Sequence, residues 1–214
     1  MMRKKLFLAV VLCAALLAGC ASREESVALL RQAYGTATAE AKASITSHGG
    51  FFCTYTVEMK ETPEGFCTTV LQPDSVKGVA AHLSSDGMTL SFDDVALETL
   101  TPQEEGFSPA DALPFLILDL RREMPTAFCE ETVNGEKRLS LEYQEETASG
   151  RTAWKRISLE KESLFLREAE LYLDGNLILS VQCEKLTLTP QKPLAEMQGL
   201  CYTEPKCTAC FAFA

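Results

Sequence analysis

Few residues in this chain could perform covalent or acid–base chemistry. The 214 residues contain two histidines, His48 and His82, and no Gly-x-Ser-x-Gly nucleophile motif. We expect His48 in a loop and His82 on a strand, both with structural or solvated roles. Adjacent carboxylates occur at Asp93-Asp94, Glu104-Glu105, Glu130-Glu131 and Glu145-Glu146. Neighbours on a strand point to opposite faces, so this spacing does not form acid–base pairs. The sequence therefore predicts a protein that is not an enzyme.

Cysteines are the other side chains that could be reactive or bind a metal ion. Cys207 and Cys210 have the spacing of a redox motif, and Cys201 could join them around a metal ion. No βαβ pattern surrounds them and no second cysteine pair is present, so we expect neither a redox site nor a metal. A calcium-binding loop of the form Asp-x-Asp-x-Asp-Gly is also missing. We expect no cofactor.

The first twenty residues give Cys20 a different chemistry. A basic start, Arg3-Lys4-Lys5, precedes an apolar run over residues 6–16 and then Leu17-Ala18-Gly19-Cys20. This run is shorter than the ~20 apolar residues that a spanning helix needs, and it has the pattern of a signal peptide. The last four residues resemble the lipobox of bacterial lipoproteins. That resemblance implies cleavage between Gly19 and Cys20 and a diacylglyceryl group on the Cys20 thiol. A plain signal peptide is the alternative.

Composition restricts the partners of the remaining chain. Without residues 1–19, 17 basic residues stand against 30 acidic ones, a formal net charge of −13. Such a charge argues against binding to nucleic acid, which needs a basic face. It also disfavours contact between the protein body and anionic lipid, so the acyl anchor alone would attach the protein to the membrane. We expect a lipid-anchored protein on the extracytoplasmic face of the cell membrane.

Seven cysteines remain after Cys13 and Cys20 are set aside, and an odd number cannot all pair internally. They are Cys53, Cys67, Cys129, Cys183, Cys201, Cys207 and Cys210. Most of the first four fall in strand-like stretches, where a free thiol behaves as a small apolar residue. Buried thiols and one or two disulfides both remain open.

Hydrophobic periodicity predicts a helix before the first strands. Val27, Leu30, Ala33 and Ala37 recur at spacings of three and four, and alanines continue to Ala43. His48-Gly49-Gly50 supplies a stop. The expected helix therefore lies within residues 21–47. A second helix is expected after Ser108, which suits the N-cap, with Pro109 in the first position and an apolar face running to Met124.

The other periodic segments alternate with a period of two, which is typical of strands. The expected strands cover residues 51–60, 66–72, 76–83, 88–92, 95–98, 127–133, 139–143, 152–159, 164–173 and 177–188. Asn134-Gly135 is the strongest hairpin signal. Leu186 and Leu188 are out of phase with Leu177 to Cys183, which predicts a bulge near Glu184.

These elements predict a mostly antiparallel α+β domain over residues 24–189. The signal peptide would cover residues 1–19, a lipidated end and spacer residues 20–23, and a poorly ordered tail residues 190–214. Nine or ten antiparallel strands with one apolar side must curl. We therefore expect a curved sheet or half-barrel covering one or two helices.

The apolar strand faces and the second helix would line the concave side. The expected lining residues are Tyr55, Val57, Met59, Leu90, Phe92, Leu116, Ile117, Leu120, Leu141, Leu179 and Val181. They enclose either a ligand-sized cavity or a solid core.

The order of elements resembles the family of the lipoprotein carrier LolA and its relatives LolB, RseB, LprG and LppX. Residues 159–172 resemble that family's strand, short acidic loop and strand, and Asp174-Gly175-Asn176 with residues 177–188 resembles the hairpin that follows. Leu166 stands where the family pattern usually has proline. Residues 108–120 are similar to helices of small lipoproteins from Gram-positive anaerobes. The resemblance implies an apolar ligand cavity and a LolA-like fold.

Two functions follow as hypotheses. The first is a membrane-anchored, non-enzymatic lipoprotein that binds a lipid or a lipidated chain in the concave sheet. The second is an interaction or sensor module with a solid core, which contacts another envelope protein through its acidic convex face.

The lipobox interpretation makes a direct prediction. Replacing Cys20 by Ala removes the thiol that would carry the acyl group, so the protein should leave the membrane fraction or stay unprocessed. Detergent phase partitioning and intact mass measure this outcome. Unchanged partitioning of Cys20→Ala would contradict it.

Overall fold

The computed structural model describes residues 26–50, 52–93, 95–98, 104–122 and 124–190. The signal-like segment with Cys20, the tail from residue 191 and the Cys207/Cys210 pair lie outside these ranges. A first helix covers residues 26–35 and is called the N-terminal helix below. The remaining elements are β1 (Ala37–Ser47), β2 (Cys53–Thr62), β3 (Gly65–Gln72), β4 (Ala80–Ser84), β5 (Gly87–Phe92), β6 (Val95–Glu98), α2 (Ala112–Arg122), β7 (Ala127–Val133), β8 (Glu136–Glu146), β9 (Thr152–Glu160), β10 (Leu166–Leu173) and β11 (Asn176–Pro190).

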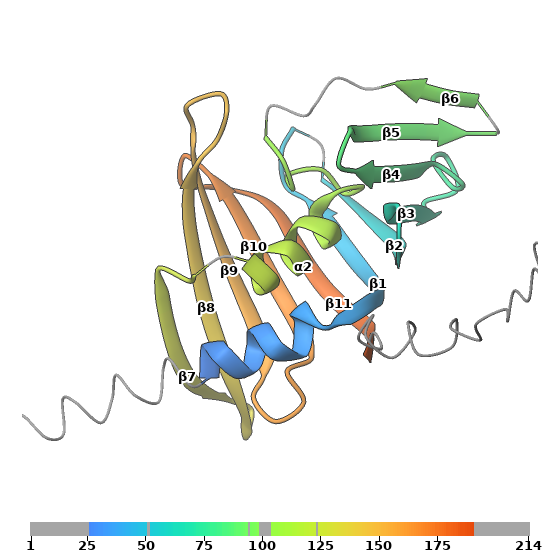
Figure 1. The fold of residues 1–214 in the computed structure, drawn as a ribbon. Coiled ribbons are helices and arrows are strands. Elements are labelled where there is room, and N and C mark those ends of the chain that lie inside the picture. Colours follow the sequence, from blue (N-terminus) through green and yellow to red (C-terminus); the bar gives the residue numbers. More distant parts are fainter. Residues whose placement is uncertain (1–25, 51, 94, 99–103, 123, 191–214) are drawn as a thin grey trace, which may run out of the picture.

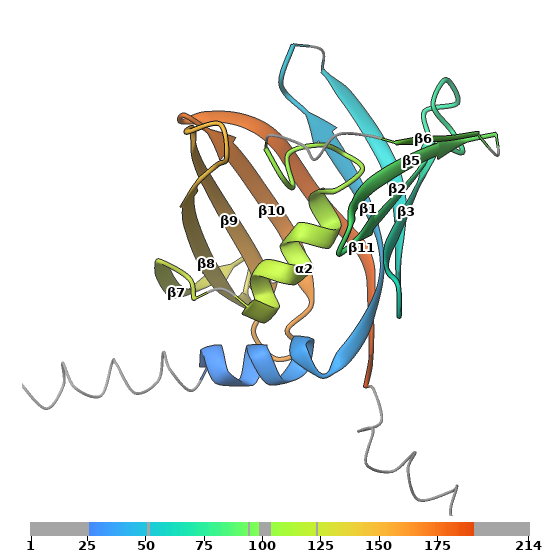
Figure 2. The same cartoon turned by 45° about the horizontal axis from the view of Figure 1, so that its top comes forward.

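All eleven described strands form one antiparallel sheet in the order β6-β5-β4-β3-β2-β1-β11-β10-β9-β8-β7. The pair β1–β11 joins two meanders, β2 to β6 on one side and β7 to β10 on the other (Figure 1). The sheet curves around α2, while the N-terminal helix lies across one end (Figure 2). The predicted fold class, a curved antiparallel sheet covering helices, is confirmed.

The largest correction concerns residues 37–47, which were expected to be helical and instead form β1. The N-terminal helix is confirmed only over residues 26–35. Alanine favours helices in isolation, but here alternate residues are buried: Ala39, Ala41 and Ala43 are 0–3 % exposed. The intervening positions are polar, so the segment has a strand's period of two. Pairing with both β2 and β11 outweighs the weak helix propensity.

Helix α2 packs its apolar face into the concave side of the sheet. Leu113, Leu116, Ile117 and Leu120 are all 0–1 % exposed and belong to one hydrophobic cluster with Ala39, Ala41 and Ala43 of β1. Small side chains at the centre of the sheet leave room for the bulky side chains of a helix. The alanines that misled the helix prediction therefore serve helix-on-sheet packing.

The start of α2 differs from the sequence expectation. The helix begins at Ala112, because residues 108–111 form a turn instead. Asp111 Oδ1 accepts hydrogen bonds from the Ser108 amide and hydroxyl at 2.8 Å each, and the Ala112 amide donates to the Ser108 carbonyl at 3.0 Å. At the other end Met124 lies beyond α2 and is 54 % exposed, so it does not belong to the apolar face.

Two local predictions are confirmed. Ala43 pairs with Cys183 and Lys42 with Lys185, so Glu184 is the extra residue of a bulge. The bulge brings Leu186 and Leu188 against the core. Asn134 and Gly135 have φ of 54° and 86° in the two-residue turn between β7 and β8.

The packing of β1 predicts that it will not tolerate larger side chains. Ala43→Leu adds volume where the side chain is 0 % exposed, and overpacking should lower the free energy of unfolding by about 2 kcal/mol. Glu40→Leu, on the exposed side of the same strand, should change it by less than about 1 kcal/mol. Urea denaturation measures both. Equal effects would contradict the packing described for β1.

Candidate functional site

The structure brings eight of the eleven predicted lining residues together. They are 0–1 % exposed and lie in one hydrophobic cluster: Val57, Met59, Leu116, Ile117, Leu120, Leu141, Leu179 and Val181. Tyr55 is partly buried against the same cluster. Leu90 is half-buried on β5, and Phe92 at the end of that strand is 48 % exposed. The predicted residues therefore form the packed contact between the sheet and α2, with Leu90 and Phe92 outside it.

Sequence reasoning missed other members of this cluster. Leu139, Ile157, Leu159, Leu166 and Leu171 are 0–2 % exposed on β8, β9 and β10. Their period-two alternation was the available signal, and it placed them on strands. On β8 it also indicated the face, because Leu139 is two residues from the predicted Leu141 and points to the same side.

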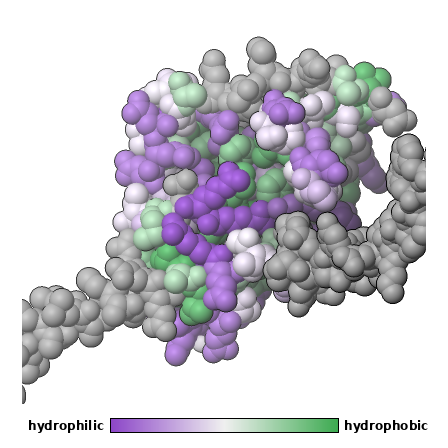
Figure 3. Space-filling model, viewed as in Figure 1, coloured by the Kyte–Doolittle hydropathy of each residue, from purple (hydrophilic) through white to green (hydrophobic). Residues whose placement is uncertain are grey.

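Helix α2 is too short to cover the whole concave side. Its 11 residues extend about 16 Å, whereas eleven strands at ~4.8 Å spacing cover roughly 50 Å. In Figure 3, hydrophobic residues gather at the centre of the face seen in Figure 1, between hydrophilic residues. The concave side thus combines a packed centre with less covered margins.

Arg121 fastens the last turn of α2 to two other parts of the chain. Its guanidinium donates to both carboxylate oxygens of Glu61 on β2, at 2.7 and 2.6 Å. It also donates to the carbonyls of Tyr34 and Ala37 at 3.0 and 2.8 Å. The Ala39 amide donates to the same carboxylate at 2.8 Å. One arginine therefore links α2, β2 and the junction between the N-terminal helix and β1.

Two opposing effects determine the pKa of Glu61. Burial would raise the pKa, but the hydrogen bonds from Arg121 and the Ala39 amide outweigh it, so the pKa lies below its usual range. The carboxylate is therefore charged at neutral pH, as the pairing with Arg121 requires.

A second buried ion pair joins α2 to the other meander. Lys155 on β9 is 2 % exposed, and its ammonium lies 3.0 Å from Asp119 of α2 and 2.8 Å from Glu145 of β8. Burial would lower the pKa of Lys155, but the two carboxylates outweigh it and raise the pKa. Lys155 is therefore charged, and α2 is held by ionic contacts on both of its sides.

Tyr34 lies on the N-terminal helix and fills the end of the core that this helix covers. Its side chain is 0 % exposed, and its hydroxyl donates to the Leu164 carbonyl at 2.7 Å. Burial raises the pKa of this phenol, so it stays neutral and keeps its donor proton.

An apolar groove of about 540 Å³ lies beside the N-terminal helix and is called the end groove below. It is lined by Ser26, Leu29, Gln32, Ala33, Thr36, Leu139, Lys161, Glu162, Leu164 and Pro190. Leu29, which is 55 % exposed, contributes apolar surface that is open to solvent. Lys161, Glu162 and Gln32 supply a polar margin. Sequence reasoning missed this site because it is built from four separate elements.

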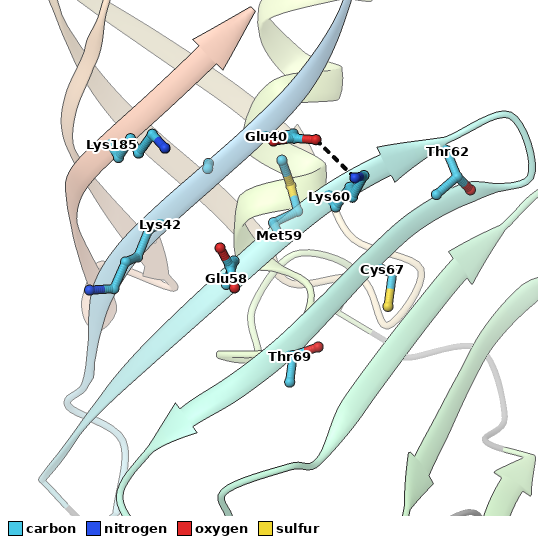
Figure 4. A pocket seen from close by; sticks show the side chains of 10 residues that line it. Glu40, Lys42, Glu58, Met59, Lys60, Thr62, Cys67, Thr69 and Lys185 are labelled. Atoms are coloured by element: carbon cyan, nitrogen blue, oxygen red, sulfur yellow. Dashed lines mark ion pairs between the residues drawn. The ribbon is translucent and has the colours of Figure 1, made fainter.

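A second groove of about 560 Å³ lies on the convex face of β1, β2, β3 and β11 (Figure 4). Its side chains are mostly polar or charged, including Lys42, Lys185 and Glu58, and Lys60 pairs with Glu40 at 3.1 Å. This lining suits an apolar ligand less well than the end groove does.

The two histidines, for which structural or solvated roles were expected, lie in different segments. His48 follows β1, its ring bonds the Ser180 hydroxyl at 2.9 Å, and it packs edge-on against Phe52; His82 lies on β4. Over the described ranges, no three metal-binding side chains form a cluster.

Four cysteines lie within the described residues, all on strands and all with free thiols. Cys183 is buried, which raises its pKa to about 11, whereas Cys129 is exposed. Burial, expected for the strand cysteines, therefore holds for Cys183 and not for Cys129. Among the helices described, none has the length and apolar character to cross a membrane.

The Arg121–Glu61 contact predicts an acid-sensitive fold. Glu61→Gln keeps the shape but removes the charge, and should lower the free energy of unfolding at pH 7 by about 2 kcal/mol. Because the pKa of Glu61 is depressed, its stabilisation is present above roughly pH 5 and is lost as the pH falls. The difference between the two proteins should therefore shrink in acid. Denaturation curves from pH 3 to pH 7 measure this, with exposed Glu58→Gln as the control; a pH-independent difference would contradict it.

Comparisons with known proteins find resemblance only among solved structures. No family model and no curated protein matches the chain. An uncharacterised conserved protein from Thermus thermophilus is 10 % identical, with 86 % of this chain and 95 % of that chain covered and a TM-score of 0.48. An outer membrane lipoprotein-sorting protein domain from Vibrio parahaemolyticus is 15 % identical over 81 % and 95 %, with a TM-score of 0.44. A LolA superfamily protein from Nitrosomonas europaea is 10 % identical over 78 % and 94 %, with a TM-score of 0.37.

Proposed function

We propose that this chain is an extracytoplasmic lipoprotein, anchored through Cys20, whose domain binds a lipid or a lipidated chain without covalent chemistry. The observation that carries the proposal is the end groove, an open and largely apolar depression beside the N-terminal helix. Its volume of about 540 Å³ falls within the range typical of small-molecule sites, ~300–1,000 Å³.

The lining of the end groove suits an amphipathic ligand. Leu29, Ala33, Leu139 and Leu164 offer apolar contacts to an acyl chain. Lys161, Glu162 and Gln32 offer polar contacts to its headgroup. Covering the open part of Leu29 would remove apolar surface from water, which is favourable by ~25 cal/mol per Å².

The position of the end groove in the chain relates it to the proposed anchor. Ser26 lines the groove and lies six positions after Cys20. Six extended residues reach about 20 Å at most. A lipidated Cys20 would therefore hold the groove close to the membrane surface, which fits a fixed receptor, donor or sensor better than a diffusing carrier.

A protein-interaction module without a ligand is the second candidate. The observation in its favour is the packed centre of the concave side, where Val57, Met59 and Leu141 are 0 % exposed against α2. In this case the acidic convex face would contact another envelope protein and the end groove would stay empty.

Native mass spectrometry of the full chain, purified from membranes in detergent, tests the proposal. We expect a noncovalent lipid that collisional activation removes, in addition to the covalent mass on Cys20. Leu29→Gln should weaken the affinity for this lipid about fivefold and so lower its occupancy, because it removes roughly 1 kcal/mol of apolar contact. Leu29→Met keeps the apolar surface and is the matched control. A wild-type chain free of noncovalent lipid would reject the lipid-binding function and leave the interaction module.

A further inference from the structure

Strand β7 ends the sheet with a free edge. It is seven residues long, contains neither proline nor lysine, and pairs with β8 without a register shift. Very short strands, charged side chains, proline and bulges are the common devices that prevent a free edge from pairing with another chain. Of these, β7 has the charges of Glu130 and Glu131, which select against some partners and in favour of others. In the part of the chain that the structure describes, no strand lies beyond β7, so its outer backbone groups have no partner.

The hairpin geometry identifies which backbone groups are free. Val133 and Glu136 flank the two-residue turn, so they form the hydrogen-bonded type of pair that closes such a hairpin. Hydrogen-bonded pairs alternate along an antiparallel ladder, which directs the amides of Cys129 and Glu131 toward β8. The amides and carbonyls of Phe128, Glu130 and Thr132 therefore point away from the sheet. An extended segment could therefore form backbone hydrogen bonds at three alternate residues of β7.

The side chains of β7 specify the chemistry of such a segment. Glu130 already pairs with Lys161, at 2.5 Å. Glu131, on the opposite and convex face, has no ion-pair partner among the described residues. It lines a groove of about 260 Å³ together with Glu168, Glu170 and Arg156.

The basic side chains near this groove are already engaged by carboxylates. Arg156 lies between Glu142 and Glu170 at 3.5 and 3.6 Å, and Arg138 pairs with Glu168 at 2.9 Å. The convex surface beside β7 therefore keeps a negative excess. On the concave face Phe128 is half-buried against the core and offers an apolar contact.

We propose that β7 is a docking edge for an extended segment of a partner protein, which adds to the sheet as a twelfth strand. The segment alternates basic side chains, facing Glu131 on the convex surface, with apolar side chains beside Phe128. Backbone hydrogen bonds supply the affinity, and the alternating side chains supply the selectivity. This edge is separate from the end groove, so the inference does not depend on lipid binding.

Self-pairing is disfavoured by the same residues. Two copies of β7 aligned antiparallel about their centres would bring Glu130 of each copy together and place Glu131 near its counterpart. Like charges directly opposite one another destabilise a strand pair. The two glutamates therefore act against a second copy and in favour of a basic partner.

The test uses a blocked seven-residue peptide, Thr-Lys-Val-Lys-Val-Lys-Thr, and the full chain in detergent. Fluorescence anisotropy should show saturable binding, and hydrogen exchange should slow at the amides of Phe128, Glu130 and Thr132. Glu130→Pro removes one outward amide, which an edge strand tolerates, while Glu130→Ala loses the same carboxylate and keeps the amide. We expect the proline variant to bind at least about fivefold more weakly than the alanine variant.

Other results would overturn the proposal. Equal binding by Glu130→Pro and Glu130→Ala, or no added protection at the three amides, would rule out strand addition. A second peptide has the same composition but its lysines clustered. If it binds as tightly as the alternating peptide, binding depends on charge alone, and the proposed alternation of basic and apolar side chains is rejected. Analytical ultracentrifugation provides one more outcome: a dimer that Glu130→Pro dissociates would make a second copy the occupant and reject the basic partner. Circular dichroism of both variants confirms that the fold is retained.

Discussion

One guanidinium group joins the last turn of α2 to the start of β1 and the end of β2. Arg121 reaches from the last turn of α2 to the carboxylate of Glu61 and to the carbonyls of Tyr34 and Ala37. Those carbonyls end the N-terminal helix and begin β1, where the chain changes from helix to strand and its backbone acceptors need donors. The arginine supplies them and places the helix at the same time. Lys155 and Asp119 complete the arrangement on the other meander.

This arrangement separates packing from binding on the concave side. The centre is filled by α2 against the alanines of β1 and the larger side chains of β8 to β11. The margin beside the N-terminal helix stays open, and there Leu29 is exposed next to Lys161 and Glu162. A protein whose core were equally closed at every margin would have no comparable surface for an amphipathic molecule. Stability and the proposed binding thus rest mainly on different side chains, with Leu139 and Leu164 contributing to both.

The sequence predicted the architecture better than it predicted the site. Period-two alternation identified most strands, the Asn134-Gly135 turn and the bulge at Glu184, because these are set by local chemistry. The helix prediction for Ala37–Ser47 was wrong. Alanine's local helix preference is weaker than the pairing of this segment with two neighbouring strands, one of them near the other end of the described chain. The ion pairs of Arg121 and Lys155 and the end groove depend on such distant partners. Eight of the residues proposed to line a cavity lie in one buried cluster, and periodicity alone does not distinguish a packed core from a cavity.

The adjacency of β1 and β11 has a consequence for how the chain reaches its native state. Ala37 pairs with Pro190, so the central ladder of the sheet closes a loop that contains nearly the whole described chain. Such long-range closure is entropically costly and makes folding slow compared with local hairpins. The two meanders can form early, but each keeps an open inner edge until β1 pairs with β11. Between the formation of the meanders and the pairing of β1 with β11, these open edges make the chain most prone to aggregation.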